Sequence, residues 1–192
     1  MRPIAFVAVA LLCASARSSW SGCFDAYNRT CLDSWGVVDG LAHFSLRCMP
    51  PAPKVRPISW CALGLNEGNG TMVVAEVMMA QVLASGTVVM ESRRNIAHAA
   101  PDCMPVQLTN LTMGIVDSSG MLTVNWTRPA SVPAPAVGQG YVDIVDAPVW
   151  VIAAISAGAR VQQKCDVDAI IGHQGAYASP TQINVFQPGL TW

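Results

Sequence analysis

The chain has 192 residues, of which 52% are hydrophobic and only 12% are charged. This length is typical of one globular domain with a core of ordinary size, and so large an apolar fraction excludes intrinsic disorder. The formal net charge is −1, and the only lysines are Lys54 and Lys164. No basic face is therefore available for the phosphates of a nucleic acid, which excludes nucleic-acid binding.

The N-terminus predicts export. Arg2 precedes an apolar run from residue 4 to residue 13, and Ala14-Ser15-Ala16 follows it. This pattern is typical of a secretory signal peptide over residues 1–16, cleaved after Ala16. An uncleaved anchor is the alternative, but the run is too short to cross a bilayer.

Residues 17–40 form a segment that contains two cysteines, and residues 41–192 are predicted to form one β-domain. Short β-favouring runs are separated by proline-rich or glycine-containing turns, which indicates antiparallel strands and a β-sandwich. Residues 73–90 are also compatible with a buried helix, but their β-branched residues and the Ser85-Gly86 turn favour a hairpin. The predicted strands are Leu41–Cys48, Ile58–Leu65, Met72–Leu83, Thr87–Arg93, Val106–Val116, Met121–Arg128, Val142–Ile155 and Gln182–Phe186.

Asparagines and cysteines agree with a secreted protein. Of the seven asparagines, four begin an Asn-x-Thr sequon and are candidate glycosylation sites: Asn28, Asn69, Asn110 and Asn125. Six cysteines remain after the signal peptide: Cys23, Cys31, Cys48, Cys61, Cys103 and Cys165. An even number in a secreted chain, with no Cys-x-x-Cys pair, predicts three disulfides rather than a zinc site. We favour Cys48 with Cys61, because they lie on consecutive predicted strands, and leave the other pairings open.

Several short motifs occur in order between Phe44 and Phe186. They are Trp60-Cys-Ala-Leu-Gly-Leu65, Gly70-Thr-Met72, Ala75-Glu-Val77, Ser85-Gly-Thr-Val-Val89, Leu122-Thr-Val-Asn-Trp-Thr-Arg128, Trp150-Val-Ile-Ala153 and His173-Gln-Gly175. In this order they resemble the DOMON domain family, and especially its haem-binding branch, which includes the cytochrome domain of cellobiose dehydrogenase and plant secreted b-type cytochromes.

The resemblance implies an immunoglobulin-like β-sandwich that holds a ligand between its sheets. In the haem-binding branch that ligand is haem b, and the family's methionine and histidine ligands correspond to Met72 and His173. Such domains often work with a flavin domain or a membrane cytochrome, which here would be a separate chain, since no transmembrane segment is expected after the signal peptide. Other DOMON domains lack haem, so the alternatives are an extracellular module that binds carbohydrate or a protein, and a structural adhesion domain.

The residue types suit this role. A thioether and an imidazole fill both axial positions of haem iron, which favours electron transfer. His173 lies in a glycine-flanked loop, His98 lies in an alanine-rich loop, and His43 is expected to be structural. Pairing of His43 with His173 is the alternative ligand set. The sequence contains no Gly-x-Ser-x-Gly, His-Glu-x-x-His or phosphate-binding loop motif, so an independent enzyme is not expected.

Charged residues near these motifs raise further expectations. Strand alternation puts Glu76 on the same face as Met72, an inward charge that is unfavourable unless a bulge intervenes. Arg93 and Arg94 are candidates for contacts with haem propionates, although a solvated strand end is favoured. Asp166 and Asp168 follow Cys165 and are expected to lie solvated in a disulfide-bonded loop. The sequon at Asn69 adjoins Met72, where a glycan would crowd the expected pocket, so either the sequon is unoccupied or the sugar points outward.

Overall fold

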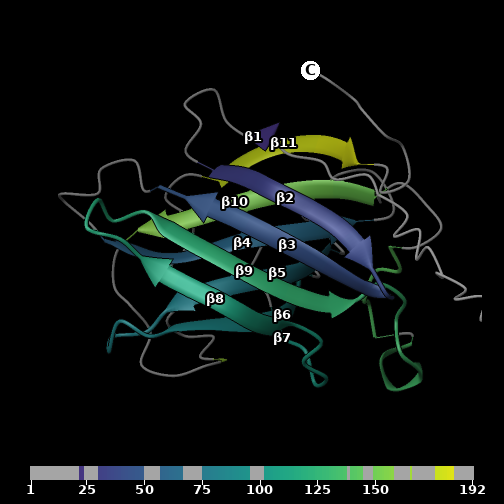
Figure 1. The fold of residues 1–192 in the computed structure, drawn as a ribbon. Helices are drawn as coiled ribbons and strands as arrows, with labels where there is room; N and C mark the ends of the chain where they lie inside the picture. Colours follow the sequence, from purple (N-terminus) through teal and green to yellow (C-terminus); the bar gives the residue numbers. More distant parts are fainter. Residues whose placement is uncertain are drawn as a thin grey trace, which may run out of the picture.

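The computed structural model describes residues 22–23, 30–49, 57–66, 75–95, 102–137, 139–144, 149–157, 165 and 176–183. These residues form two stacked antiparallel sheets, with β3 and β9 in front of β4 and β5 in Figure 1. The five-stranded sheet has the order β1-β2-β3-β9-β8. Its strands are β1 (Gly22–Cys23), β2 (Thr30–Val38), β3 (Leu41–Cys48), β8 (Asn110–Val116) and β9 (Leu122–Pro129).

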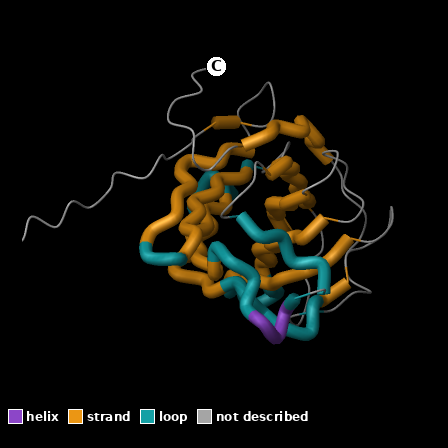
Figure 2. Tube along the Cα trace, turned by 90° about the vertical axis from the view of Figure 1, so that its right-hand side faces the viewer, coloured by secondary structure: helices purple, strands orange, loops and turns teal. Residues whose placement is uncertain are grey.

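The six-stranded sheet has the order β11-β10-β4-β5-β6-β7. Its strands are β4 (Ile58–Asn66), β5 (Ala75–Val82), β6 (Val88–Asn95), β7 (Asp102–Cys103), β10 (Val149–Ala157) and β11 (Ala176–Ile183). A single turn of 3₁₀-helix, η1 (Ala134–Ala136), lies among loops at one end of the sandwich (Figure 2). The predicted all-β sandwich is confirmed.

Side-chain alternation explains the inter-sheet core. In β3, Ala42, Phe44 and Leu46 are buried, whereas His43 and Arg47 are exposed. This period of two places one face of the strand on the core and the other in solvent.

Aromatic contacts fill the middle of this core. The ring of Phe44 stacks on Trp126, with centroids 4.9 Å apart, and meets Trp35 edge-on at 5.0 Å. The indole N–H of Trp126 donates to the sulfur of Met78 on the opposite sheet at 3.1 Å. The two sheets are therefore closely packed against each other at this level.

All six cysteines expected in the mature chain form disulfides, as predicted. Cys48–Cys61 joins β3 to β4 and so connects the two sheets, which confirms the pairing that the sequence favoured. The others are Cys23–Cys31, between β1 and β2, and Cys103–Cys165, which ties β7 to a residue between β10 and β11.

Some predicted strand limits were wrong. Residues 142–144 are not part of β10, because the N–H of Val142 donates to Glu76 and that of Ile144 donates to the Ala130 carbonyl. Strand β11 starts at Ala176 rather than Gln182, and it accommodates Pro180 because it is an edge strand.

Strands before residue 41 were not expected. Strand β2 pairs with β3 along its length, with a register shift between Leu32 and Ser34. Such an irregularity interrupts the alternation of apolar and polar residues on which recognition of a strand depends.

Candidate functional site

The outer face of the six-stranded sheet, which points away from the inter-sheet core, is buried. In most two-layer sandwiches the outward residues of each strand are polar and solvated. Here β4 is buried from end to end, although successive side chains point to opposite faces. A second apolar cluster, separate from the core, lies on this face: Trp60 (5% exposed), Ala62 (4%), Val77 (9%), Met79 (1%) and Ala154 (7%).

Small residues occupy the centre of this face. Ala62 is paired with Met79 on one side and Ala154 on the other, and Gly64 is paired with Val77. We call Trp60, Ala62, Gly64, Val77, Met79 and Ala154 the outer apolar face. Because alanine and glycine project little from the strands, this part of the sheet offers a flat apolar floor between larger side chains.

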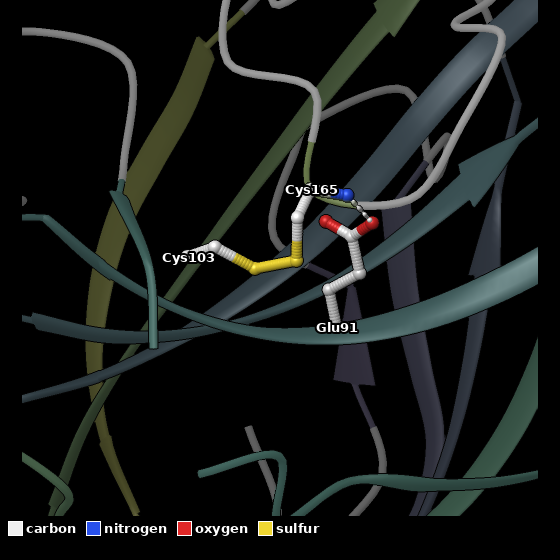
Figure 3. A group of neighbouring side chains, drawn as sticks. All are labelled: Glu91, Cys103 and Cys165. Carbon is white, nitrogen blue, oxygen red and sulfur yellow. Dashed lines mark hydrogen bonds between the residues drawn. A yellow bond between two sulfur atoms is a disulfide. The ribbon is translucent and has the colours of Figure 1, made fainter. Parts of the chain in front are cut away.

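A buried ion pair borders the outer apolar face on β6. Glu91 and Arg93 are both fully buried, and Nε of Arg93 lies 2.6 Å from Oε2 of Glu91. The other carboxylate oxygen accepts the backbone N–H of Cys165 at 2.6 Å (Figure 3). The expected solvation of Arg93 at a strand end is therefore wrong. The neighbouring Arg94 is half-buried and packs against Gly140.

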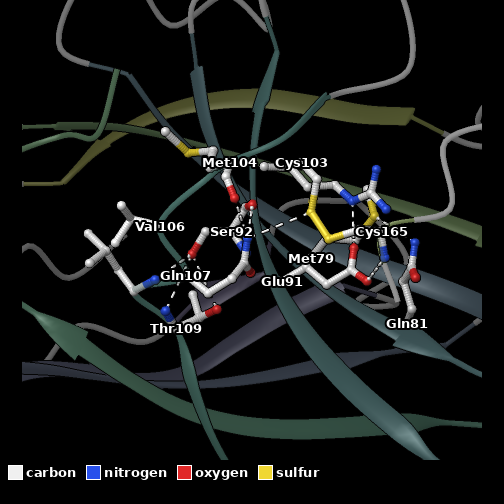
Figure 4. Close-up of a disulfide and its surroundings, with 12 residues drawn as sticks. Met79, Gln81, Glu91, Ser92, Cys103, Met104, Val106, Gln107, Thr109 and Cys165 are labelled. Carbon is white, nitrogen blue, oxygen red and sulfur yellow. Dashed lines mark hydrogen bonds and ion pairs between the residues drawn. A yellow bond between two sulfur atoms is a disulfide. The ribbon is translucent and has the colours of Figure 1, made fainter. Parts of the chain in front are cut away.

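Glu91, Cys103 and Cys165 are the group of potential metal ligands found among the described residues. Figure 4 shows them together, with Met79 and Gln81 on the adjacent strand. The two sulfur atoms are bonded to each other, and Arg93 already balances the charge of Glu91. With the disulfide intact this cluster acts as a structural anchor rather than as a metal centre.

Glu76 points inward, as strand alternation predicted, and its charge is balanced by an arginine rather than relieved by a bulge. Nη1 of Arg128, on β9 of the opposite sheet, lies 2.5 Å from both carboxylate oxygens. The N–H of Val142 donates to Glu76 at 2.7 Å, and Arg128 donates to the Val142 carbonyl at 2.8 Å. Burial raises the pKa of Glu76, and the positive charge of Arg128 opposes that shift.

Sequence reasoning missed this pair, although both members stood in the motifs that carried the resemblance. Glu76 lies in the Ala75-Glu-Val77 motif, and Arg128 ends the Leu122–Arg128 motif. A strand-terminal arginine together with an inward glutamate was the available signal. The pair fastens the loop after β9 to the six-stranded sheet.

The space between the sheets is filled by the core side chains, including Trp35, Phe44 and Trp126. The expectation that a ligand is held between the two sheets therefore does not fit the packing of the described residues. The outer apolar face is likewise covered by protein in this structure, since its side chains are only 1–9% exposed.

Met72 and His173 lie outside the described residues, as do His98, Asp166, Asp168 and the sequons at Asn28 and Asn69. Strand β5 begins three residues after Met72, and β11 begins three residues after His173. His43 is exposed on the solvent face of β3. Of the remaining sequons, Asn110 is exposed at the start of β8, and Asn125 is half-buried on β9.

The described part of the chain contains no helix long and apolar enough to cross a membrane. No protein-family model matches the sequence, and no curated protein does so.

Solved structures do match. The cytochrome domain of Myriococcum thermophilum cellobiose dehydrogenase is similar with a TM-score of 0.56 at 13% identity, over 90% of this chain and 85% of that one. The cytochrome b domain of pyranose dehydrogenase from Coprinopsis cinerea is similar with a TM-score of 0.53 at 12% identity, over 88% of this chain and 89% of that one. This chain therefore has the fold of these two cytochrome domains, in agreement with the DOMON resemblance of its motifs.

Proposed function

We propose that the protein is a secreted electron-transfer module that binds one haem b, with Met72 and His173 as the axial ligands. The observation that carries the proposal is the likeness of the fold to two solved cytochrome domains, over 90% and 88% of this chain. The outer apolar face lies on the sheet whose strands β5 and β11 follow the two candidate ligands, and burying a macrocycle in an apolar site removes its surface from water, which is the dominant favourable term in binding such a cofactor.

The residue types of this face suit the group, because they are apolar or small. Since its side chains are only 1–9% exposed without a ligand, a haem here would take the place of the protein atoms that cover them. Glu91 and Arg93, which border this face on β6, are paired with each other. Apolar surroundings also limit the access of water to a bound metal and so influence its redox potential.

Chain reach also supports the ligand assignment. Strands β5 and β11 are separated by β4 and β10, so they lie about 14 Å apart laterally at the usual strand spacing. The register through β10 and β4 places Ala176, the first residue of β11, level with Met79 of β5. Met79 is four residues after Ala75, the first residue of β5, so the starts of the two strands are offset by about 13 Å along the strand direction. Three residues span up to about 10 Å, so Met72 and His173 together can bridge this diagonal of roughly 19 Å.

When bound, a haem with two protein ligands supplies reversible one-electron chemistry at the iron. His173 would provide the stronger bond and Met72 a neutral thioether that raises the reduction potential. The solved cytochrome domains belong to dehydrogenases, which supports a redox partner for this chain, such as a flavin domain or a membrane cytochrome. Three disulfides are in keeping with an extracellular location.

The test is the visible spectrum of protein secreted by a host that supplies haem. We expect a red product with the sharp reduced bands of a six-coordinate b-type haem that is extractable, because no Cys-x-x-Cys-His motif attaches it covalently. A folded but colourless product would contradict the proposal. It would favour a haem-free module that binds carbohydrate or a protein.

Two variants test the ligands separately. M72A should keep part of the haem, lose the six-coordinate spectrum and have a lower potential, whereas H173A should lose most of the haem. H43A is the matched control, because His43 is exposed on the five-stranded sheet and should have no effect. If H43A changes the spectrum and M72A does not, the axial pair is His43 with His173.

A further inference from the structure

Cys165 is held to the six-stranded sheet by two independent interactions. Its sulfur is bonded to Cys103 on β7, and its backbone N–H donates to Oε1 of Glu91 on β6 at 2.6 Å (Figure 3). Cys165 also has a φ of 61°, in the left-handed region that residues other than glycine rarely adopt. Such a conformation persists only where the surroundings hold it, which indicates that both interactions constrain this residue.

Glu91 is well suited to bind a backbone N–H. It is fully buried, and its second oxygen is occupied by Arg93 at 2.6 Å. A hydrogen bond to an ionised carboxylate is stronger than one between neutral groups. Glu91 faces away from the inter-sheet core, since its strand neighbours Met90 and Ser92 have the opposite orientation and Met90 belongs to the core. Its contacts therefore serve the outer side of the sheet.

The position of Cys165 divides the connection that contains His173. The chain leaves the sheet at Ala157 on β10 and rejoins it at Ala176 on β11, yet residue 165 lies at β6 on the other side of β4 and β5. Without an anchor at Cys165, the connection has eighteen residues, 158–175. With the anchor, the part containing His173 has only the ten residues 166–175, and a shorter closed loop has fewer conformations.

We propose that Glu91 is a positioning residue for the histidine ligand: by holding Cys165, it restricts the conformations of the segment that contains His173 and so favours haem retention. This inference rests on the proposed function. Glu91 itself does not contact the iron, and its effect is transmitted through the backbone of Cys165.

Two double variants isolate the hydrogen bond. In both, Arg93 is replaced by methionine, so that no unpaired cation remains when Glu91 is changed. E91Q/R93M keeps an acceptor for the Cys165 N–H, whereas E91M/R93M removes it. Replacing a buried ion pair by apolar residues of similar volume is often neutral for stability, so E91M/R93M should fold, and E91Q/R93M should fold because its buried amide keeps the Cys165 N–H as a partner. They therefore differ at one side chain, in the acceptor under test.

The measurements are the rate of haem loss to an excess of a haem-scavenging protein, the visible spectrum and the thermal unfolding curve. We expect E91M/R93M to lose haem roughly tenfold faster than E91Q/R93M, the effect of about one hydrogen bond. It should also show a partly five-coordinate spectrum that added imidazole restores to six-coordinate, since imidazole replaces a displaced histidine. A general loss of stability would not be corrected by imidazole.

Disulfide variants provide the matched controls. C103S/C165S should lose haem faster than the wild type, whereas C23S/C31S, which removes the disulfide between β1 and β2 of the other sheet, should not. If E91M/R93M does not fold, E91D carries the test, because it keeps the charge but withdraws the carboxylate from Cys165. It should then accelerate haem loss.

Equal rates of haem loss in the two double variants, or an unchanged rate in E91D, would overturn the role of Glu91 while leaving haem binding intact. A folded wild-type protein without haem would instead overturn the proposed function, and the role of Glu91 with it.

Discussion

The two outer faces of the sandwich have opposite character. On the five-stranded sheet, His43 and Arg47 of β3 are exposed, and Arg47 forms a solvent-exposed ion pair with Asp33. On the six-stranded sheet, the corresponding positions are buried and include the fully buried pair of Glu91 and Arg93. One sheet therefore has a single packed face, and the other has two. A two-layer sandwich needs only one packed face per sheet, so the six-stranded sheet carries an additional layer of contacts.

The largest expected effect compares the ion pairs of the two faces. R93A should destabilise the protein by about 3–5 kcal/mol, because it leaves the buried Glu91 without its partner. R47A should change stability by less than about 1 kcal/mol, since water already solvates both members of its pair. Denaturant unfolding of both variants measures this difference. Similar losses would mean that the two outer faces are equally solvated.

A smaller effect is expected from enlarging one residue on each face. A62F inserts a ring into the outer apolar face and should cost about 1–3 kcal/mol by overpacking, besides lowering the haem content per protein. T123F, on the outward side of β9, should change stability by no more than about 0.5 kcal/mol and leave haem binding unaffected. Unfolding curves and the ratio of haem to protein absorbance check both. Full haem content in A62F would place the ligand elsewhere.

The smallest effect concerns the turn between β8 and β9 of the exposed sheet. Asp117 accepts hydrogen bonds from the hydroxyl and N–H of Ser119 and from the N–H of Met121, and the Ser119 hydroxyl is the main cause of its lowered pKa. Because the folded-state pKa lies below the unfolded one, this stabilisation is complete above the ordinary aspartate range and is lost as the pH falls through the folded value.

D117N keeps an acceptor but does not titrate, so its stability should depend less on pH than that of the wild type between about pH 2 and pH 5. Unfolding midpoints measured across that range provide the comparison. Parallel curves for the two proteins would show that the carboxylate does not contribute. Because Asp117 is fully exposed, we expect a small difference.

Several elements could be predicted from local sequence. Strand β3 has the predicted limits, since Leu41–Cys48 alternates strictly and ends before a proline-rich stretch. The hairpin of β5 and β6 was also predicted, because Ser85-Gly86 marks a turn and Gly86 has the positive φ that glycine adopts without strain. These signals depend on neighbouring residues, and tertiary contacts reinforced them.

Other elements depended on distant residues. The start of β10 was misplaced because Val142 donates its N–H to Glu76, 66 residues away, instead of to a neighbouring strand. Apolar composition in residues 142–144 indicates a buried segment but does not specify the partner of each backbone group. The early start of β11 and the presence of β2 were missed for another reason. Register irregularities in the pairing of these strands interrupt the alternation of apolar and polar residues by which a strand is recognised.

Some features of the candidate site were also predicted from the sequence, and others became visible only in the tertiary structure. Sequence motifs, by resemblance, pointed to Met72 and His173 and to the family of folds, and the cysteine count predicted complete pairing. By itself, then, the sequence determined the all-β class, the number of disulfides and the ligand hypothesis, because each depends on residue types and their order. Only the tertiary structure decided that the outer face of one sheet is buried, that Glu76 pairs with Arg128 and that Glu91 holds Cys165. These three features join residues that are far apart in sequence, and only the packing of the folded chain brings them together.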